Sequence, residues 1–328
     1  TLVAQNALDC QKGYFFKIAR FENLTIRNLT LTYRPTPFVQ GTILKADQAN
    51  NRTTLALDPA FNHLALLQET PHSRFWCRVG THGHPLHAKP ANPSWLDVGV
   101  DANRRIIVEP ARDGTVIIHA GAFSLADTLH GLFNWAAGDS IVIWKRAAQD
   151  GFCFEEGRNL RLENVRVESA LHYAIKLRGI QGAVLSVCRV EPASGAMMSS
   201  SADGIDVQQS RDIVLERCAL IATGDDAISF LNHGHGDNGL EFEQKFPPPY
   251  PETNEGVLLR DNHLEGGNRH GILLLASRAE VLGNTLRHIR QYGIKFAGDH
   301  TRIESNIFQS VGSFAAYRHI QDELNTGI

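Results

Sequence analysis

Hydrophobic and polar positions along this chain follow a repeated four-residue unit. The unit consists of a small residue, an isoleucine, a residue of any type and an apolar residue, in that order. The unit occurs five times, at residues 174–177, 204–207, 227–230, 271–274 and 293–296. Each copy alternates as a β-strand does. Two of the intervals, 204 to 227 and 271 to 293, are 23 and 22 residues long. Units of this size cannot bury an apolar face alone, so the period indicates a solenoid.

A second strand pattern follows the unit at a constant offset, as at residues 183–190 and 213–220. Its apolar residues alternate with one break in the middle, which is typical of two short strands joined by a bend. The pattern recurs at residues 24–31, 160–167, 257–264, 279–286 and 301–308. Short runs punctuated by glycine and asparagine argue against a helical solenoid. We therefore predict an all-β chain that forms a right-handed parallel β-helix.

One interior column of this β-helix is predicted by aligning the second strands. Asparagines stacked in such a column can hydrogen-bond along the axis, as in other stacked-strand structures. The column consists of Leu29, Val165, Cys188, Cys218, Asn262, Asn284 and Asn306.

The repeat disappears between residues 35 and 150. Strand patterns at 53–57, 75–79, 105–109, 115–119 and 140–144 predict a small antiparallel β-barrel-like domain inserted there. We divide the chain into first coils at 1–34, the insertion at 35–150, and the main β-helix at 151–328. Two loops, 192–201 and 232–255, interrupt the main β-helix, and loops of repeat proteins gather on one face.

Composition and charge exclude several classes of protein. The 328 residues are 43% hydrophobic and 20% charged, which is enough for a large core. A formal net charge of −3 leaves no basic surface for nucleic acid, and no apolar run is long enough to span a membrane. The five cysteines are too few and odd in number for a disulfide framework. The first coil begins almost at once, which leaves open whether the chain is a fragment of a longer protein.

Three aspartates are the candidate catalytic residues. Asp203 and Asp226 each precede a copy of the unit, 23 residues apart, and Asp225 is beside Asp226. On successive rungs of one parallel sheet, Asp203 and Asp226 would lie about 4.8 Å apart. Hydrolysis of a glycosidic bond needs one carboxylic acid and one carboxylate, and crowding raises the pKa of at least one of them. The alternative is a set of turn aspartates or a calcium site on the edge of the solenoid.

Polar residues around the aspartates are candidates for binding sugar. The third position of the unit is predicted to face outward, His270 and Tyr292 continue the aspartate column, and two histidines lie in loop 232–255. The substrate-binding candidates are Lys176, Asp206, His233, His235, Arg269, His270, Tyr292 and Lys295. We predict neither a metal nor a cofactor.

Two enzyme families resemble this chain at the acidic motifs. Ser-Ala-Asp-Gly-Ile-Asp at 201–206 and Gly-Asp-Asp-Ala-Ile at 224–228 resemble the signature of polygalacturonases, which are inverting β-helical glycoside hydrolases. Asn-Arg-His-Gly-Ile at 268–272 is similar to their Gly-His-Gly segment. Gly293 stands where that family has an arginine that binds the uronate carboxylate.

A second resemblance, to the β-helical α-1,3-galactosidases that remove terminal galactose from blood-group-B-type glycans, covers more of the chain. It rests on the run at 31–42, where that family inserts a β-barrel, and on the segments 225–234 and 269–274. The resemblance implies inverting hydrolysis, with Asp225 as the general acid and Asp203 and Asp226 holding and deprotonating the water. It also implies an oligo- or polysaccharide substrate, and we expect an extracellular or periplasmic location.

Two alternatives from other classes remain. A polysaccharide lyase or uronate epimerase would need a base such as Lys176, Lys295 or Arg269, often with Ca²⁺. A non-catalytic glycan-binding β-helix would make the aspartates incidental. The sequence leaves open the sugar, the linkage, exo versus endo cleavage and the oligomeric state.

Overall fold

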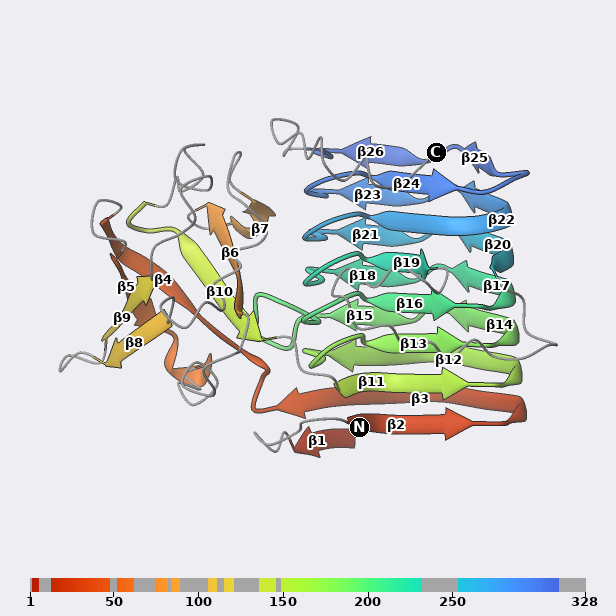
Figure 1. Cartoon of the computed structure of the whole chain (residues 1–328), viewed down its shortest axis with the longest axis horizontal. Helices are drawn as coiled ribbons and strands as arrows, with labels where there is room; N and C mark the ends of the chain where they lie inside the picture. Colours follow the sequence, from red (N-terminus) through yellow and green to blue (C-terminus); the bar gives the residue numbers. More distant parts are fainter. Residues whose placement is uncertain are drawn as a thin grey trace.

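The computed structural model contains a β-helix and a separate antiparallel sheet (Figure 1). It describes residues 2–5, 13–47, 52–61, 75–81, 84–88, 106–110, 115–120, 136–145, 149–231 and 253–312. Within these residues the one helical element is a short 3₁₀ turn, η1 (Pro59–Phe61). No helix in this part of the chain is both long and apolar enough to cross a membrane.

One face of the β-helix, here called the front sheet, is made by the repeated units. Its strands β13, β16, β19, β22 and β24 begin at Ile175, Ile205, Ile228, Ile272 and Ile294, and these isoleucines pair in parallel register from rung to rung. The strands are β2 (Gly13–Ala19), β11 (Gln149–Glu155), β13 (Ile175–Arg178), β16 (Ile205–Gln208), β19 (Ile228–Leu231), the start of β22 (Ile272–Leu282) and β24 (Ile294–Ala297). The predicted unit is confirmed as a strand at every copy.

The back sheet is made by the second pattern, and the predicted bend is present in it. Val187 and Arg217 have φ values of 56° and 54° at the junctions between paired short strands. The strands are β1 (Leu2–Gln5), β3 (Glu22–Arg34), β12 (Arg158–Glu168), β14 (Gln181–Ser186), β15 (Arg189–Glu191), β17 (Arg211–Glu216), β18 (Ala219–Ile221), β20 (Asn254–Arg260), β21 (His263–Glu265), the end of β22, β23 (Thr285–Arg287), β25 (Arg302–Glu304) and β26 (Ile307–Gln309). Parallel pairing of every described rung confirms the predicted parallel β-helix.

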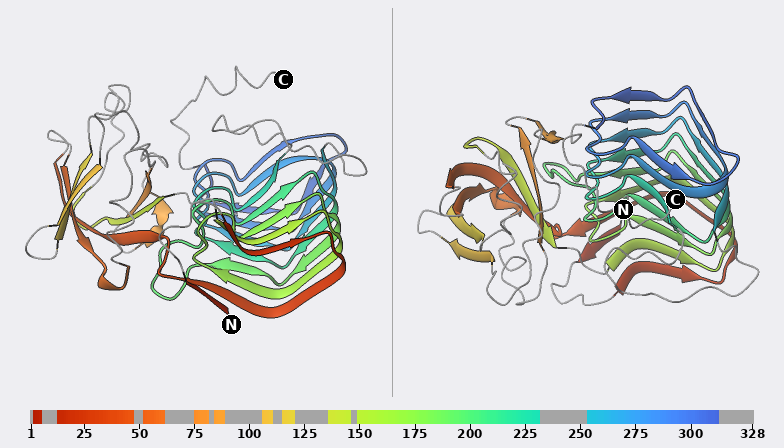
Figure 2. Two further views of the ribbon diagram at one scale, coloured as in Figure 1. Left: turned by 60° about the horizontal axis from the view of Figure 1, so that its bottom comes forward. Right: turned by 45° about the horizontal axis from the view of Figure 1, so that its top comes forward.

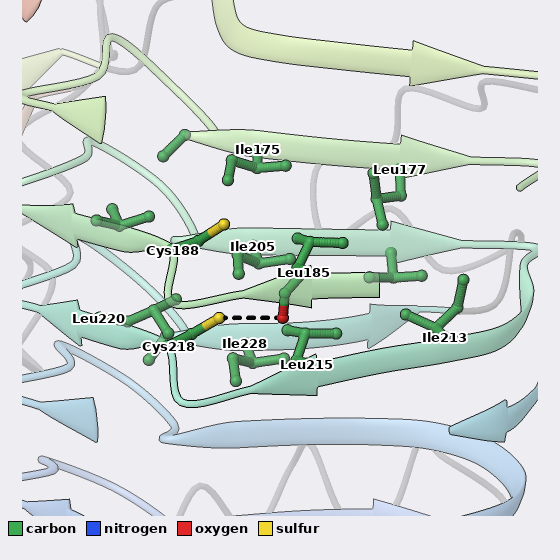
Figure 3. Packing of buried hydrophobic residues seen from close by; sticks show 14 of the residues in the cluster. Ile175, Leu177, Leu185, Cys188, Ile205, Ile213, Leu215, Cys218, Leu220 and Ile228 are labelled. Atoms are coloured by element: carbon green, nitrogen blue, oxygen red, sulfur yellow. Dashed lines mark hydrogen bonds between the residues drawn. The ribbon is translucent and has the colours of Figure 1, made fainter. Parts of the chain in front are cut away.

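The interior of the β-helix is filled by isoleucine, leucine and valine from both sheets (Figure 3). Cys188 and Cys218 are buried free thiols among them, and the Cys218 thiol lies 3.4 Å from the Leu185 carbonyl oxygen. On the rungs that follow these cysteines in the chain, the predicted asparagine column is confirmed. The Nδ2 of Asn262 donates to Asn284 and that of Asn284 to Asn306, each at 2.9 Å.

The inserted domain is a seven-stranded antiparallel sheet in the order β7-β6-β10-β4-β5-β9-β8, with β7 and β8 at its two ends among the described strands. Both views of Figure 2 show this sheet to one side of the β-helix. The strands are β4 (Phe38–Asp47), β5 (Arg52–Leu57), β6 (Phe75–Thr81), β7 (His84–Ala88), β8 (Ile106–Pro110), β9 (Thr115–Ala120) and β10 (Ser140–Lys145). The chain leaves the β-helix after β3, and β11 resumes it by pairing with β2. The insertion therefore separates two adjacent coils without disturbing their register.

The inserted sheet contacts the loop that precedes Asp203. Phe38, Val142 and Trp144 from the sheet pack with Phe61 and with Met198 of this loop. The side chain of Gln40 donates to the Gly195 carbonyl oxygen at 2.7 Å and accepts from the Met197 amide at 2.9 Å, and the Trp144 indole donates to the Ser201 carbonyl oxygen at 3.0 Å. The insertion thus holds the segment that leads into the candidate site.

Candidate active site

Asp203 and Asp226 lie one above the other at the entrance to strands β16 and β19. The amide of Gly204 donates to the Asp226 carbonyl oxygen at 3.0 Å, which places the two residues on adjacent rungs. The Asp226 amide donates to Asp203 Oδ1 at 3.1 Å, and the His270 amide donates to Asp226 Oδ1 at 2.8 Å. Each carboxylate is therefore oriented by the backbone of the next rung, in the predicted column.

Close backbone contact requires glycine at two positions next to these aspartates. A Cβ on Gly224 would lie 2.6 Å from the Ser200 carbonyl oxygen, and one on Gly204 would lie 2.6 Å from the Ala227 carbonyl oxygen. The turn before Asp225 therefore packs directly on the turn before Asp203. The hydroxyl of Thr223 donates to the Asp225 carbonyl oxygen at 3.2 Å and closes the upper turn.

The three candidate carboxylates converge. One oxygen each from Asp203, Asp225 and Asp226 lies within 4.8 Å of the other two, and all three residues are buried. Asp225 is one position outside the column, yet its carboxylate reaches the same place. The spacing is shorter than the gap of about 6.5–9.5 Å that separates acid and base in most inverting glycosidases. Both paired catalytic carboxylates and cation sites have oxygens at such a spacing. A test of this site therefore needs a chelator to tell the two apart.

Burial and neighbouring negative charge act together on Asp203. Loss of solvation raises the pKa of its carboxyl well above the ordinary value, and the carboxylates of Asp225, Asp226 and Asp206 raise it further. A hydrogen bond from the Ser229 hydroxyl, 2.6 Å from Asp203 Oδ2, acts in the opposite direction. Asp203 is thus a carboxyl group that favours its protonated form.

Asp206 and Ser229 lie behind Asp203, away from solvent. Both have no exposed surface, whereas the third position of the unit is predicted to face outward. The Ser229 hydroxyl is 3.0 Å from Asp206 Oδ1, and the Gln208 side-chain amide donates to Asp206 Oδ2 at 2.8 Å. Burial raises the pKa of Asp206 to about 6, while Lys176 lowers it. Asp206 therefore contacts Asp203 through Ser229 rather than forming part of an open sugar-binding surface.

The rungs before Asp203 carry a second polar cluster that the sequence patterns missed in part. Lys176 is paired with Asp206 in the sheet register, and its Nζ lies 4.0 Å from Asp150 Oδ2 and 4.8 Å from the Tyr173 ring centre. His172 Nδ1 is 2.8 Å from Asp150 Oδ1. Asp150 precedes Gly-Phe at 151–152, where the repeat has phenylalanine in place of isoleucine. Asp150 therefore has the same position in the repeat as Asp203 and Asp226, although its coil does not match the isoleucine pattern.

The rungs after Asp226 carry His270 and Tyr292, whose rings meet edge to face at 5.3 Å. His270 is buried, and burial together with Arg269 and Lys295 lowers its pKa to about 3, so the ring is neutral. Tyr292 is 53% exposed, Lys295 is exposed and Arg269 is half-buried. These four residues flank the carboxylates on one side, as the column predicts. His233 and His235 lie outside the described residues.

No protein-family model and no curated protein matches the chain. Among solved structures, a glycoside hydrolase is similar over 93% of this chain and 90% of its own, with 8% identity and a TM-score of 0.29. An α-1,3-glucanase from Streptomyces thermodiastaticus is similar over 85% of this chain and 69% of its own, with 9% identity and a TM-score of 0.30.

A periplasmic alginate epimerase is similar over 47% of this chain, with 12% identity and a TM-score of 0.27, and the chain spans 30% of its length. All three neighbours are named as enzymes that act on carbohydrates. At these scores the likenesses carry no argument about substrate or mechanism. The resemblance to the α-1,3-galactosidases stays an expectation drawn from sequence motifs.

Proposed function

We propose that the protein is a glycoside hydrolase whose catalytic residues are Asp203, Asp225 and Asp226. The observation that carries the proposal is the convergence of three buried carboxylate oxygens within 4.8 Å. Burying several ionisable acids together costs free energy, and such clusters with shifted pKa values are concentrated at functional sites. Cleavage of a glycosidic bond uses this combination of one proton donor and one proton acceptor.

The roles follow the resemblance to inverting β-helical hydrolases. Asp225 gives its proton to the glycosidic oxygen, the bond from that oxygen to the anomeric carbon breaks, and water attacks the same carbon. Asp203 and Asp226 hold this water and take its proton. A water molecule makes hydrogen bonds of about 2.8 Å, so it can bind two carboxylate oxygens up to about 5.6 Å apart. The spacing of 4.8 Å or less supports this role for the pair.

The substrate belongs to the same proposal. We propose an oligo- or polysaccharide, with α-linked galactose as the first choice, bound between Lys176 on the earlier rungs and Arg269, Tyr292 and Lys295 on the later ones. Tyr292 offers an exposed aromatic ring on which a sugar can stack. Extracellular or periplasmic action fits a polymeric substrate.

The test is a panel of glycans and polysaccharides incubated with the wild-type protein and with Asp225→Asn, reading released reducing sugar. We expect release by the wild type and a loss of about 10²- to 10⁴-fold in the variant. Addition of a chelator leaves the rate unchanged if no cation takes part. NMR of the first product gives the stereochemistry. A product with the retained anomer would overturn the roles assigned to the three aspartates.

The second candidate is a polysaccharide lyase or uronate epimerase, favoured by the cationic residues Lys176, Arg269 and Lys295 beside the carboxylates. An unsaturated sugar product that absorbs ultraviolet light, together with a rate that falls with chelator, would favour it over hydrolysis. Glycan binding that Asp225→Asn leaves unchanged, with no product from any substrate, would indicate a non-catalytic β-helix.

A further inference from the structure

The hydroxyl of Ser229 lies between two buried carboxyl groups. Its Oγ is 2.6 Å from Asp203 Oδ2 and 3.0 Å from Asp206 Oδ1, and all three side chains are closed to solvent. A serine hydroxyl has one proton to donate. If both carboxyls were ionised, one of these two contacts would bring two oxygen acceptors together without a hydrogen between them.

We propose that Asp203, Ser229 and Asp206 share one proton and that Asp206 serves as the proton reservoir of the candidate active site. In one arrangement Asp203 is protonated and donates to Ser229, which donates to Asp206. In the other arrangement Asp206 is protonated and donates to Ser229, which donates to Asp203. Asp206 is in this sense a positioning residue, because it reaches the substrate site only through Ser229.

The charges around the chain of three residues differ at its two ends. Asp203 faces the carboxyl groups of Asp225 and Asp226, which disfavour a further negative charge there. Asp206 faces Lys176 as well as Asp150, and it accepts a hydrogen bond from Gln208. Burial raises the pKa values of both carboxyls, and the surrounding charges raise that of Asp203 while Lys176 lowers that of Asp206. The resting proton therefore lies toward Asp203.

This proton position matters for the proposed hydrolysis, on which the catalytic part of the inference rests. A protonated Asp203 cannot accept the proton of the attacking water. When Asp203 Oδ2 passes its proton to Ser229 Oγ, and Ser229 passes its own to Asp206 Oδ1, Asp203 becomes a carboxylate with no change in total charge. The bond between water oxygen and hydrogen can then break toward Asp203.

Two substitutions shift the proton in opposite directions. In Asp206→Asn, Gln208 holds the new carbonyl oxygen, so the new NH₂ donates to Ser229 and leaves the serine proton for Asp203. The negative charge of Asp206 is also gone, so Asp203 ionises more readily. Ser229→Ala removes the side-chain donor to Asp203 Oδ2 found among the described residues, so Asp203 stays protonated to higher pH. Each shift is expected to be about one pH unit.

The experiment is infrared spectroscopy of protein labelled with ¹³C at the aspartate carboxyls, recorded against pH. The unmodified protein should show the band of a buried protonated carboxyl at neutral pH. The band should disappear at lower pH in Asp206→Asn and persist to higher pH in Ser229→Ala. Ser186→Ala, which removes a buried serine hydroxyl from the back sheet, is the matched control and should leave the band as in the wild type.

The absence of a protonated carboxyl at neutral pH, or shifts of both variants in the same direction, would overturn the proposal. The absence of the band in the unmodified protein is decisive even where a variant fails to fold, whereas the assignment of the band to Asp203 needs the shifts in the two variants, because Asp225 is a second candidate for a protonated carboxyl. The acid limb of the pH profile of kcat/KM should move with the band in each variant. If the infrared shifts occur but no glycan is cleaved, the shared proton stands and the hydrolase proposal falls.

Discussion

Two columns of stacked side chains in this β-helix have the same geometry and opposite energetics. In the interior column, Asn262, Asn284 and Asn306 repeat at one rung spacing, and each amide donates to the next at 2.9 Å. On the front sheet, Asp203 and Asp226 also repeat at one rung spacing. An amide carries both a donor and an acceptor, so a stack of asparagines satisfies itself, whereas ionised carboxylates only accept.

The aspartates therefore depend on donors from elsewhere. Asp203 and Asp226 each accept a hydrogen bond from a backbone amide of the next rung, and Asp203 Oδ2 shares a proton with the Ser229 hydroxyl 2.6 Å away. On the outer face of the back sheet, by contrast, acids are paired with bases, as in Arg260 with Glu216 at 2.5 Å and Arg278 with Glu255 at 2.7 Å. The same backbone repeat thus holds stabilising columns and one column whose charges repel. Such local conflict is expected at a functional site.

The largest effect that would sharpen this comparison is expected from Asp203→Asn. The substitution makes the column more like the asparagine ladder, so glycosidase activity should fall by about 10²- to 10⁴-fold. At a pH high enough to ionise Asp203, the free energy of unfolding should rise by about 1 kcal/mol, because one of several repelling buried acids is gone. Urea unfolding and rates of sugar release measure the two quantities. A less stable variant would contradict the repulsion that we assign to the cluster.

The reverse change, Asn284→Asp, places a carboxyl in the ladder. It removes the donors to Asn306 and to the Leu259 carbonyl oxygen and places an ionisable acid at a fully buried position. We expect a loss of about 3–5 kcal/mol in the free energy of unfolding at neutral pH, measured by urea unfolding. Asn306→Asp, at the half-buried end of the ladder, is the control and should cost less. Equal losses at both positions would show that burial does not set the cost.

The pH dependence of stability should reveal the acids of the front sheet. The pKa of Asp206 is raised from 3.8 to about 6 in the folded protein, so the folded state binds more protons than the unfolded state between these values. Its contribution to stability is full below the unfolded pKa and is lost as the pH rises through about 6.

The corresponding fall in the free energy of unfolding is on the order of 3 kcal/mol. Urea unfolding at a series of pH values measures it. His270, whose pKa is lowered from 6.5 to about 3, adds a rise over the same window. The test is therefore the difference between the wild-type and Asp206→Asn curves, and a difference that does not fall with pH would be incompatible with a raised pKa of Asp206.

The smallest expected effect concerns the inserted sheet. Trp144→Phe keeps an aromatic ring against Met198 but removes the hydrogen bond to the Ser201 carbonyl oxygen, two residues before Asp203. We expect a loss of about 1 kcal/mol in stability. The value of kcat should fall by about tenfold, or about 1.4 kcal/mol in the barrier, with little change in KM. Steady-state kinetics measure both. Unchanged kcat with lower stability would mean that the insertion supports the loop without aligning Asp203.

Residue patterns predicted the strands because each coil repeats the same packing problem. An isoleucine that fills the interior at one rung must be followed by a similar residue at the next. The positions of Ile205, Ile228 and Ile272 therefore predict the front-sheet strands and the register in which they pair. The aspartate column and the asparagine column follow from that register alone. Asp150 has the same position in the repeat but was not among the predicted site residues, because Phe152 replaces the isoleucine that defines the unit. In the structure Phe152 pairs with Ile175, so the packing accepts either residue.

Local sequence also could not place side chains that depend on contacts between distant segments. Ser229 and Asp206 occupy a position that alternation assigns to the outside, yet both are fully buried. The Trp144 indole reaches Ser201 across 57 residues, and nothing in either segment signals the contact.

The spacing of the periodic residues was therefore sufficient for the architecture and for the vertical alignment of Asp203 and Asp226, because a parallel coil repeats its register automatically. The approach of Asp225, the proton-sharing geometry around Ser229 and the support from the inserted sheet arise only when the folded coils meet. Each depends on distances of a few ångströms between groups whose separation along the chain carries no information about them.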